Sequence, residues 1–505
     1  MDRRTFNRSL LAAASSAALA PHALLAAAQT SATKIRSDLA AISRTGEAVT
    51  LPKKAVQALQ KNLRGGLLIP GSDNYDTARQ VWNGMVDKHP GLIVKCTGPA
   101  DVMRAVEFSR EHDLLVAVRG GGHSISGKSS CEGGIVIDTS PIRYCTVNPQ
   151  TQTARLGAGS LLGELDHESQ RFGLATPVGT VSHTGAGGLT LGGGHGRLSR
   201  SFGLTCDNVL SVDLVTADGR FVRASAEENP DLYWGVRGGG GNFGVATAFE
   251  YQLHDIGTEV YGGPLIYPFD QARNVFEVFA EFTASAPREM AADIIALAPP
   301  QGQGFVILSI CYQGDFATGE KLIQPVRDAM KPKIDQVGPA NYVKMQTSAD
   351  ANTPGGKLYY NKSGLMKTLE PDFLSTVADR LEEAAGSRED PQVASNVIVQ
   401  HLGGAVSDVP MDGTAYVHRD ANYDSVILSA WENPDYDEAN IQWLKESFAQ
   451  MEPYTIGLYS NHMVDSDTSK AERAFRGNYD RLVGLKNEYD PTNLFHLNAN
   501  VKPTV

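Results

Sequence analysis

Val118-Arg119-Gly120-Gly121-Gly122-His123-Ser124-Ile125-Ser126-Gly127 is the stretch around which the rest of the chain is organised. Its three consecutive glycines let backbone amides approach a ligand closely, since no Cβ stands in the way. A run of such amides forms a concave site for phosphate or another anion. His123 stands inside that site, where its imidazole can act as a nucleophile or as a hydrogen-bonding group. The stretch therefore predicts an anion-binding loop that carries a reactive side chain.

Residues 122–129 of the same region also satisfy the GxxxxGK[ST] pattern of a P-loop. A P-loop requires a helix immediately after it, because the helix N-terminus faces the phosphates. Here a short polar and glycine-containing segment leads straight into the apolar strand Ile135-Val136-Ile137. No helix fits in that space, so an ATP-binding protein is the weaker interpretation.

Length and composition describe a globular protein with more than one domain. The 505 residues are enough for two to four domains, 42% are hydrophobic and 20% are charged. The net charge of -12 is unlike the basic footprint of a nucleic-acid-binding protein, so no nucleic-acid partner is expected. Five cysteines form no CxxC pair and no metal-ligand spacing: Cys96, Cys131, Cys145, Cys206 and Cys311. We expect no metal site and mostly buried, reduced thiols.

Residues 1–28 are typical of a twin-arginine signal peptide. Arg3-Arg4 precedes an alanine-rich stretch at 10–25, and residues 26–28 offer a small-residue cleavage site. A membrane anchor is the alternative, but Ser15-Ser16 and Pro21-His22 interrupt the apolar run. Twin-arginine export carries folded proteins with their cofactors in place. We therefore expect a periplasmic or secreted mature protein without a membrane span.

The first strands and helices place the glycine loop at the end of a strand. Residues 91–96 and 114–118 read as strands, and the segment from Pro99 between them has helical periodicity. This predicts a strand–helix–strand unit with parallel strands, from whose carboxyl end the His123 loop departs. Residues 29–48 are polar and weakly patterned, which favours a linker after the signal peptide.

Two further glycine-rich stretches follow at 185–196 and 237–245. The first is not the dinucleotide fingerprint GxGxxG, because Thr190 stands where the third glycine belongs. Together with residues 119–127, the three stretches resemble FAD-linked oxidoreductases of the vanillyl-alcohol oxidase and berberine-bridge-enzyme type. Segments at 478–482, 489–495 and 498–500 are similar to the closing signature of that family.

The resemblance implies an α+β fold with a PCMH-type, two-subdomain FAD-binding domain. This domain is expected at 49–257, and the C-terminal segment at 456–505 is expected to pack back on it, so that the domain is discontinuous. Between them, the glycine density falls and strand-like runs alternate with helices. We expect residues 258–455 to form a substrate domain, an antiparallel sheet with helices on one face.

In this family the histidine of the Arg-Gly-Gly-His loop bonds covalently to the 8α-methyl of FAD, which assigns the tether to His123. The alternative is a histidine that only hydrogen-bonds a loop carbonyl. Some relatives attach FAD a second time through a cysteine, but that position is Val181 here, so a single bond is expected. The resemblance assigns further cofactor contacts to the glycine stretches and the C-terminal segment: Arg119, Gly120, Gly121, Gly122, Ser124, Gly127, Thr184, Gly185, Gly188, Gly192, Gly193, Gly194, Gly196, Asp207, Asn208, Gly241, Asn242, Gly244, Val245, Asn498 and Asn500.

The family implies oxidation of a small molecule, an alcohol, sugar or amine, which needs a base for the departing proton. Relatives supply a tyrosine from a Tyr-x-Asn-Tyr segment, but this chain reads Tyr459-Ser460-Asn461-His462. Histidine is a natural base near neutral pH, so we expect His462 to take the role. The alternative is that His462 only lines the site. Tyr459 and Asn461 are expected to position substrate or flavin.

The electron acceptor is less closely specified by the sequence. In relatives, the residue at the position of Thr184 influences access of oxygen to the flavin. An oxidase that produces hydrogen peroxide is favoured over a dehydrogenase with another acceptor. A protein of another class, which carries flavin for binding or electron relay without turnover, stays open as an alternative.

Overall fold

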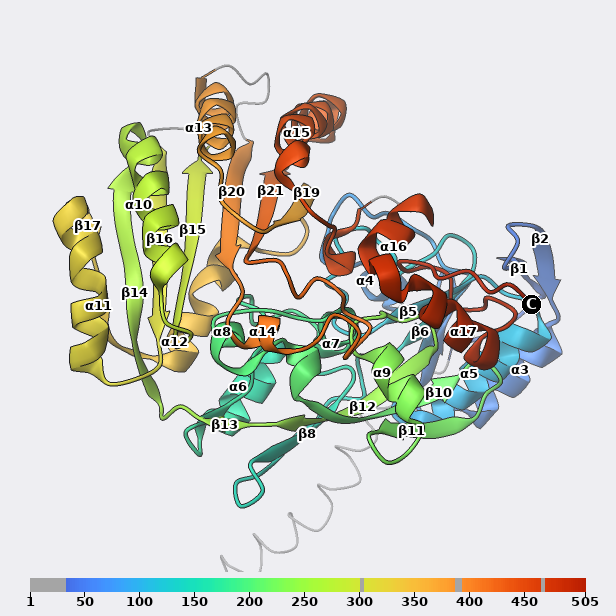
Figure 1. The fold of residues 1–505 in the computed structure, drawn as a ribbon. Coiled ribbons are helices and arrows are strands. Elements are labelled where there is room, and N and C mark those ends of the chain that lie inside the picture. The colour runs from blue at the N-terminus through green and yellow to red at the C-terminus, as the bar shows by residue number, and fades with distance from the viewer. Residues whose placement is uncertain (1–32, 300–303, 387–392, 465–467) are drawn as a thin grey trace, which may run out of the picture.

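Figure 1 shows a computed structural model that describes residues 33–299, 304–386, 393–464 and 468–505. Its first sheet has the strand order β3-β4-β6-β5. The strands β4 (Leu92–Lys95), β6 (Ile135–Asp138) and β5 (Val116–Arg119) are parallel and almost wholly buried, as their continuous apolar sequences require. Helix α5 (Pro99–Glu111) joins β4 to β5, although β6 lies between these two strands. The predicted parallel strand–helix–strand unit is confirmed.

The described part of residues 29–48 is not a linker. Strands β1 (Leu39–Ile42) and β2 (Ala48–Leu51) pair antiparallel as a hairpin, and helix α3 (Lys53–Asn62) follows. Ile35, Ala41 and Leu51 are buried in the core around the first sheet. Strands of only four residues are too short to show a period in the sequence, which explains the wrong prediction.

A second, antiparallel sheet completes the expected two-subdomain domain. Its order is β11-β10-β12-β8-β7, and the Asp218-Gly219 turn joins β10 to β11 with Gly219 at φ 87°. The larger elements of this region are β7 (Cys145–Asn148), β8 (Thr153–Gly157), α6 (Leu162–Gln170), α7 (Ala186–Gly192), β10 (Val209–Thr216), β11 (Phe221–Ser225), α9 (Pro230–Val236) and β12 (Gly244–Gln252). An Asp-Gly pair favours the tight turn that this hairpin requires.

The third large sheet is antiparallel, with the order β17-β14-β16-β15-β20-β21-β19, and β18 also pairs with β14. Its strands are β14 (Glu259–Pro268), β15 (Met290–Ala298), β16 (Phe305–Tyr312), β17 (Ile334–Asp335), β18 (Gly338–Asn341), β19 (Leu358–Met366), β20 (Ala394–His401) and β21 (Tyr423–Trp431). Helices α10 (Ala272–Ser285), α11 (Phe316–Ala329), α13 (Pro371–Gly386) and α15 (Asp437–Met451) cover one face (Figure 1) and enclose its main core. The expected sheet with helices on one face is confirmed.

The C-terminal segment packs back on the first domain. Helix α17 (Tyr479–Tyr489) lies beside α9 in Figure 1 and contacts it. Lys486 of α17 is fully buried, and its Nζ donates hydrogen bonds to the Asn242 carbonyl oxygen and to Asp490 Oδ2, at 2.9 and 2.7 Å. A buried charge requires such partners. The first domain is therefore built from two separate parts of the chain.

The remaining elements are short: β3 (Gly66–Leu68), α4 (Tyr75–Arg79), β9 (Leu174–Ala175), α8 (Ser199–Phe202), β13 (His254–Asp255), α12 (Tyr342–Gln346), α14 (Ala405–Asp408) and α16 (Thr468–Phe475). Within the described ranges no helix has the length and apolar character needed to span a membrane. The signal-peptide prediction for residues 1–28 lies outside the described residues.

Candidate active site

A cavity of about 490 Å³ lies between the glycine-rich loops and the helix-free face of the large sheet. One side is formed by residues 120–124 after β5, the first turns of α7 and the glycines before β12. The other side is formed by β19, β20 and β21, and residues 495–499 of the C-terminal segment close one end. The volume is in the range that encloses a cofactor or drug-sized ligand.

The glycine loops touch each other backbone to backbone. A Cβ on Gly121 would lie 2.5 Å from the Gly185 Cα atom, so neither loop tolerates a side chain at this contact. At Gly188, by contrast, an added Cβ would meet no protein atom within 4 Å, because Gly188 borders the cavity. The loops therefore form a cradle with room for an extended ligand against bare backbone.

His123 lies on this cavity with its ring held between other rings. Trp82 stacks on it at 4.4 Å between ring centroids, and His183 lies 5.1 Å away on a tilted plane. Burial, together with the nearby His183, lowers the pKa of His123 to about 4, so the imidazole is neutral at physiological pH. Its buried Nε2 atom has no hydrogen-bond partner among the described residues. A neutral imidazole with an unpartnered nitrogen can act as a nucleophile toward a ligand bound in the cavity.

Arg119 does not reach the cavity, which corrects its expected role as a direct cofactor contact. Side chains alternate along β5, so Val118 lines the cavity and Arg119 points the other way. Its guanidinium donates hydrogen bonds to Asp138 Oδ2 at 2.7 Å and to the Gln80 carbonyl oxygen at 3.1 Å. Arg119 thereby fixes the strand from which the His123 loop departs.

Several other expected cofactor contacts support the cradle from outside the cavity. A Cβ on Gly192 would lie 2.1 Å from Asn461 Oδ1, and a Cβ on Gly196 would lie 1.9 Å from the Val178 carbonyl oxygen. Asp207 forms a two-pronged ion pair with Arg419, with both contacts at 2.7 Å. The structure places these residues in packing roles, and the cavity lining likewise omits Gly127, Gly193, Gly194, Asn208, Asn242, Val245 and Asn500. The close approach of other protein atoms explains why glycine stands at 127, 192, 193, 194 and 196 without a ligand contact.

The structure brings the other expected residues to the cavity. They are Gly120, Gly121, Gly122, His123, Ser124, Thr184, Gly185, Gly188, Gly241, Gly244, Tyr459, Asn461, His462 and Asn498. Their individual contacts with a cofactor remain predictions.

Tyr459 and Asn461 hold the second glycine loop in place. Tyr459 Oη accepts hydrogen bonds from the Gly194 backbone N–H and from Asn461 Nδ2, both at 2.8 Å. Asn461 Nδ2 also donates to the Leu189 carbonyl oxygen at 3.1 Å. Burial raises the pKa of Tyr459, so its phenol stays protonated. The pair positions α7 and is poorly suited to act as a base.

His462 is paired with a buried carboxylate. Asp424 Oδ2, on β21, lies 3.2 Å from His462 Nδ1 and 3.0 Å from His195 Nε2, and Asp424 is completely buried. Burial by itself raises the pKa of a carboxyl, but His462 and His195 outweigh it and hold the pKa of Asp424 below its usual range. Asp424 is therefore an anion that can orient His462 and stabilise its protonated form.

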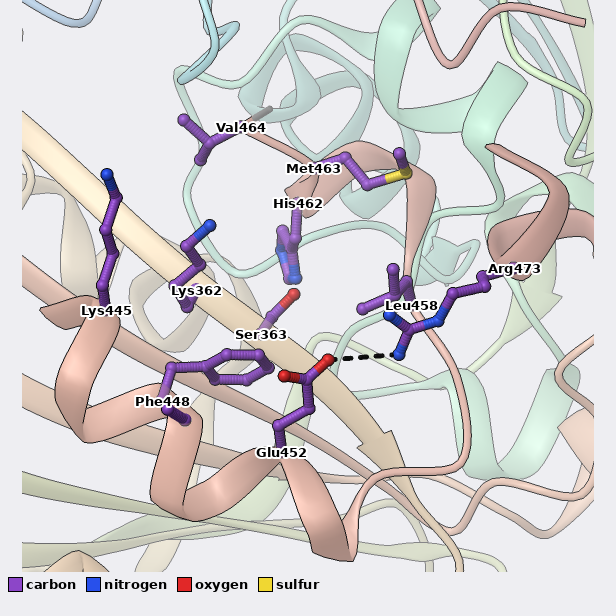
Figure 2. Close-up of a pocket in the computed structure, with 11 residues that line it drawn as sticks. Lys362, Ser363, Lys445, Phe448, Glu452, Leu458, His462, Met463, Val464 and Arg473 are labelled. Atoms are coloured by element: carbon purple, nitrogen blue, oxygen red, sulfur yellow. Dashed lines mark hydrogen bonds and ion pairs between the residues drawn. The ribbon is translucent and has the colours of Figure 1, made fainter. Parts of the chain in front are cut away.

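His462 stands between two cavities. Besides the main cavity it borders a pocket of about 220 Å³, lined by Ser363, Phe448 and the ion pair of Glu452 with Arg473 (Figure 2). Its side chain is 26% exposed, enough to meet a small molecule from the main cavity. The position suits a proton acceptor better than a buried structural histidine.

The pairing of Asp424 with His195 could not be predicted from the sequence, because the two residues are far apart in the chain and only the fold brings them together. The same is true of Asn361 on β19 and Gln400 on β20, which also line the cavity. Burial alternates along β20, so the strand has two different faces, but its polar and apolar residues do not alternate in the sequence and gave no hint of this.

Comparison with known proteins identifies the class. The family described as FAD binding domain matches residues 90–225, and the family described as Berberine and berberine like matches residues 459–502. An FAD-linked oxidoreductase of Dictyostelium discoideum is 33% identical over 449 residues, covering 88% of this chain and 96% of the relative. The chain therefore belongs to the FAD-linked oxidoreductases of the berberine-bridge-enzyme-like family, and it is an FAD-dependent oxidoreductase.

Two further relatives carry more specific descriptions. (R)-6-hydroxynicotine oxidase of Paenarthrobacter nicotinovorans is 28% identical over 457 residues, covering 88% of this chain and 97% of that protein. The structure of xylooligosaccharide oxidase from Myceliophthora thermophila, in complex with xylobiose, is similar with a TM-score of 0.79 and 25% identity. The similarity covers 89% of this chain and 100% of the other.

Proposed function

We propose that this protein oxidises an alcohol, sugar or amine with an FAD bound covalently through the 8α-methyl to His123, and passes the electrons to O2. The observation that carries the proposal is the state of His123: a neutral, buried imidazole with an unpartnered Nε2 on the wall of a backbone cradle. When bound, FAD would supply the acceptor for a hydride from the substrate. Residues 120–124, Gly185, Gly188 and Gly241 would hold it.

His462 is the base in this proposal. It accepts the proton of the substrate hydroxyl or amine while hydride leaves the adjacent carbon. Asp424, whose Oδ2 lies 3.2 Å from Nδ1, compensates the positive charge that develops on the ring. His195 shares the same carboxylate oxygen and so holds Asp424 in position.

Oxygen as the acceptor is supported by the (R)-6-hydroxynicotine oxidase relative. The reaction then yields one hydrogen peroxide for each substrate oxidised. A dehydrogenase with another acceptor is the second candidate. The measurement that separates the two is the rate at which air reoxidises the substrate-reduced flavin, with peroxide assayed in parallel. Fast, stoichiometric peroxide release supports the oxidase, and a flavin that stays reduced in air contradicts it.

The cellular location is proposed from residues 1–28 alone. A twin-arginine signal would export the folded protein, with its flavin already attached, to the periplasm or beyond. The double variant Arg3→Lys with Arg4→Lys keeps the positive charge of the segment and removes the twin-arginine pair. We expect this variant to be retained in the cytoplasm, as measured by cell fractionation, and unchanged export would contradict the proposed route.

A further inference from the structure

On the cavity face of the large sheet, polar and apolar residues lie in successive rows across the strands. Strand pairing aligns Asp424 with Gln400, then Val426 with Ile398, and then Asn361 with Leu428. The first row is polar, and it reaches the cavity through Gln400 and through His462, because Asp424 itself is completely buried and contacts His462. The next row is made of branched aliphatic side chains, and the last adds Leu428 beside the polar Asn361. A substrate that lies along this face meets polar groups at two ends and an apolar middle.

Asn361 is the unexplained member of this surface. Its side chain lines the cavity, the residue is only 2% exposed, and its Oδ1 atom has no hydrogen-bond partner in the described ranges. A buried amide without a partner is unfavourable by about 1–3 kcal/mol, so native proteins rarely retain one without a reason. A primary amide can both accept and donate a hydrogen bond. A polar group of a bound ligand would satisfy it.

The apolar rows argue against a carbohydrate. A sugar ring carries hydroxyl groups around its whole edge, and each one buried against an aliphatic side chain loses its hydrogen bonds to water. Ile398, Val426 and Leu428 offer no replacement for those bonds. An aromatic or alicyclic ring, in contrast, gains free energy by burying its surface against the same three residues.

We infer that the substrate is an alcohol or amine whose body is an apolar ring with a short side chain, and that Asn361 recognises a second polar group on it. This inference rests on the proposed function, because it assumes that oxidation occurs beside His462. Four residues along a strand separate the level of Asp424 from that of Asn361, a distance of about 13 Å between backbone positions. A ring with a short chain, together with a hydrogen bond of about 3 Å at each end, spans a comparable distance.

Two matched alcohols and one sugar test the recognition. The probes are 3-(4-hydroxyphenyl)-1-propanol, its analogue 3-phenyl-1-propanol and the disaccharide maltose. Each is titrated anaerobically into the oxidised holoenzyme, and binding is read from the perturbed flavin absorption spectrum. We expect the hydroxylated alcohol to bind about tenfold more tightly than its analogue, the ratio that one satisfied hydrogen bond produces. Maltose should bind more weakly than both.

The variant Asn361→Leu should reduce this tenfold ratio to about one, with Asn361→Ser as a second variant if leucine is not accommodated. Asn396→Leu is the matched control. Asn396 lies in the same row of the sheet and also has an unpartnered Oδ1, but it does not line the cavity. Its substitution should leave the ratio unchanged.

Tight binding of maltose, or a ratio that Asn361→Leu does not alter, would overturn the inference. Binding measures recognition by Asn361, and bleaching of the flavin measures hydride transfer. A failure of the inference about Asn361 is therefore distinguishable from a failure of the proposed oxidation. Binding with the expected ratio but without bleaching by any alcohol or amine would leave the recognition intact and contradict the proposed oxidation.

Discussion

At the scale of single residues, the proposed chemistry depends on the contact between Asp424 and His462. Asn in place of Asp424 removes the buried negative charge 3.2 Å from His462 Nδ1, and with it the compensation for the charge that develops on the ring. We expect Asp424→Asn to slow anaerobic flavin reduction by a factor of about 10²–10⁴, the range for loss of general base catalysis. His462→Ala should slow it by a similar factor. Stopped-flow absorption of the flavin measures both rates.

The double variant separates a shared role from two independent ones. If Asp424 acts only through His462, Asp424→Asn combined with His462→Ala should be no slower than His462→Ala alone. Flavin content should stay at the level of the unmodified protein, because neither residue contributes to the His123 side of the cavity. Full reduction rates in His462→Ala would contradict its assignment as the base.

Individual residues were predictable from the sequence where the chemistry is carried by a local motif. His123 and His462 were found in this way, and both line the cavity. Asp424, His195 and Asn361 were not found, because their roles depend on partners that are distant in sequence. Arg119 was misassigned for the opposite reason: it belongs to the motif, but strand alternation turns its side chain away from the cavity.

At the scale of elements, a substitution in helix α7 can test whether the glycine-rich stretch at 185–196 leaves space for a cofactor. An alanine at Gly188 meets no protein atom within 4 Å but projects into the cavity. We therefore expect Gly188→Ala to fold normally and to lose most of its bound flavin. Circular dichroism and the flavin-to-protein absorbance ratio measure the two effects.

Gly484→Ala is the control, because Gly484 lies within α17 and an added Cβ there also meets nothing within 4 Å. This variant should keep both fold and flavin, and it should be slightly more stable, since alanine favours a helix interior over glycine. A Gly188→Ala protein with full flavin content would show that α7 does not border the cofactor.

The sequence predicted elements well where the apolar pattern is continuous or periodic. The buried strand 135–138 and the strand–helix–strand unit before the His123 loop appear as expected. The hairpin of β1 and β2 was missed, because strands of only four residues are too short to show a period in the sequence. The order of strands in the large sheet was also beyond the sequence, since pairing between distant strands leaves no local pattern.

At the scale of the whole molecule, His418 links the chain before β21 to the C-terminal segment. Its Nε2 lies 2.8 Å from the Ala474 carbonyl oxygen, and burial lowers its pKa to about 4. Below its ordinary pKa of 6.5, the unfolded chain binds a proton that the native protein does not, so stability falls as the pH falls from 6.5 towards 4. At pH 5 this one group is unfavourable to folding by about 2 kcal/mol.

The variant His418→Gln removes that titration. We expect its melting temperature to fall less than that of the unmodified protein between pH 7 and pH 5, whatever its effect on packing at pH 7. Differential scanning calorimetry at the two pH values measures the difference. An equal fall in both proteins would show that His418 is as easily protonated in the native state as in the unfolded chain.

The covalent bond between His123 and FAD is the central claim, and mass spectrometry of the denatured, purified protein tests it most directly. We predict an intact mass equal to the polypeptide plus one FAD, a proteolytic peptide containing His123 that carries the flavin, and loss of both signals in His123→Ala. An intact mass equal to the polypeptide alone, with an unmodified His123 peptide, would contradict the claim.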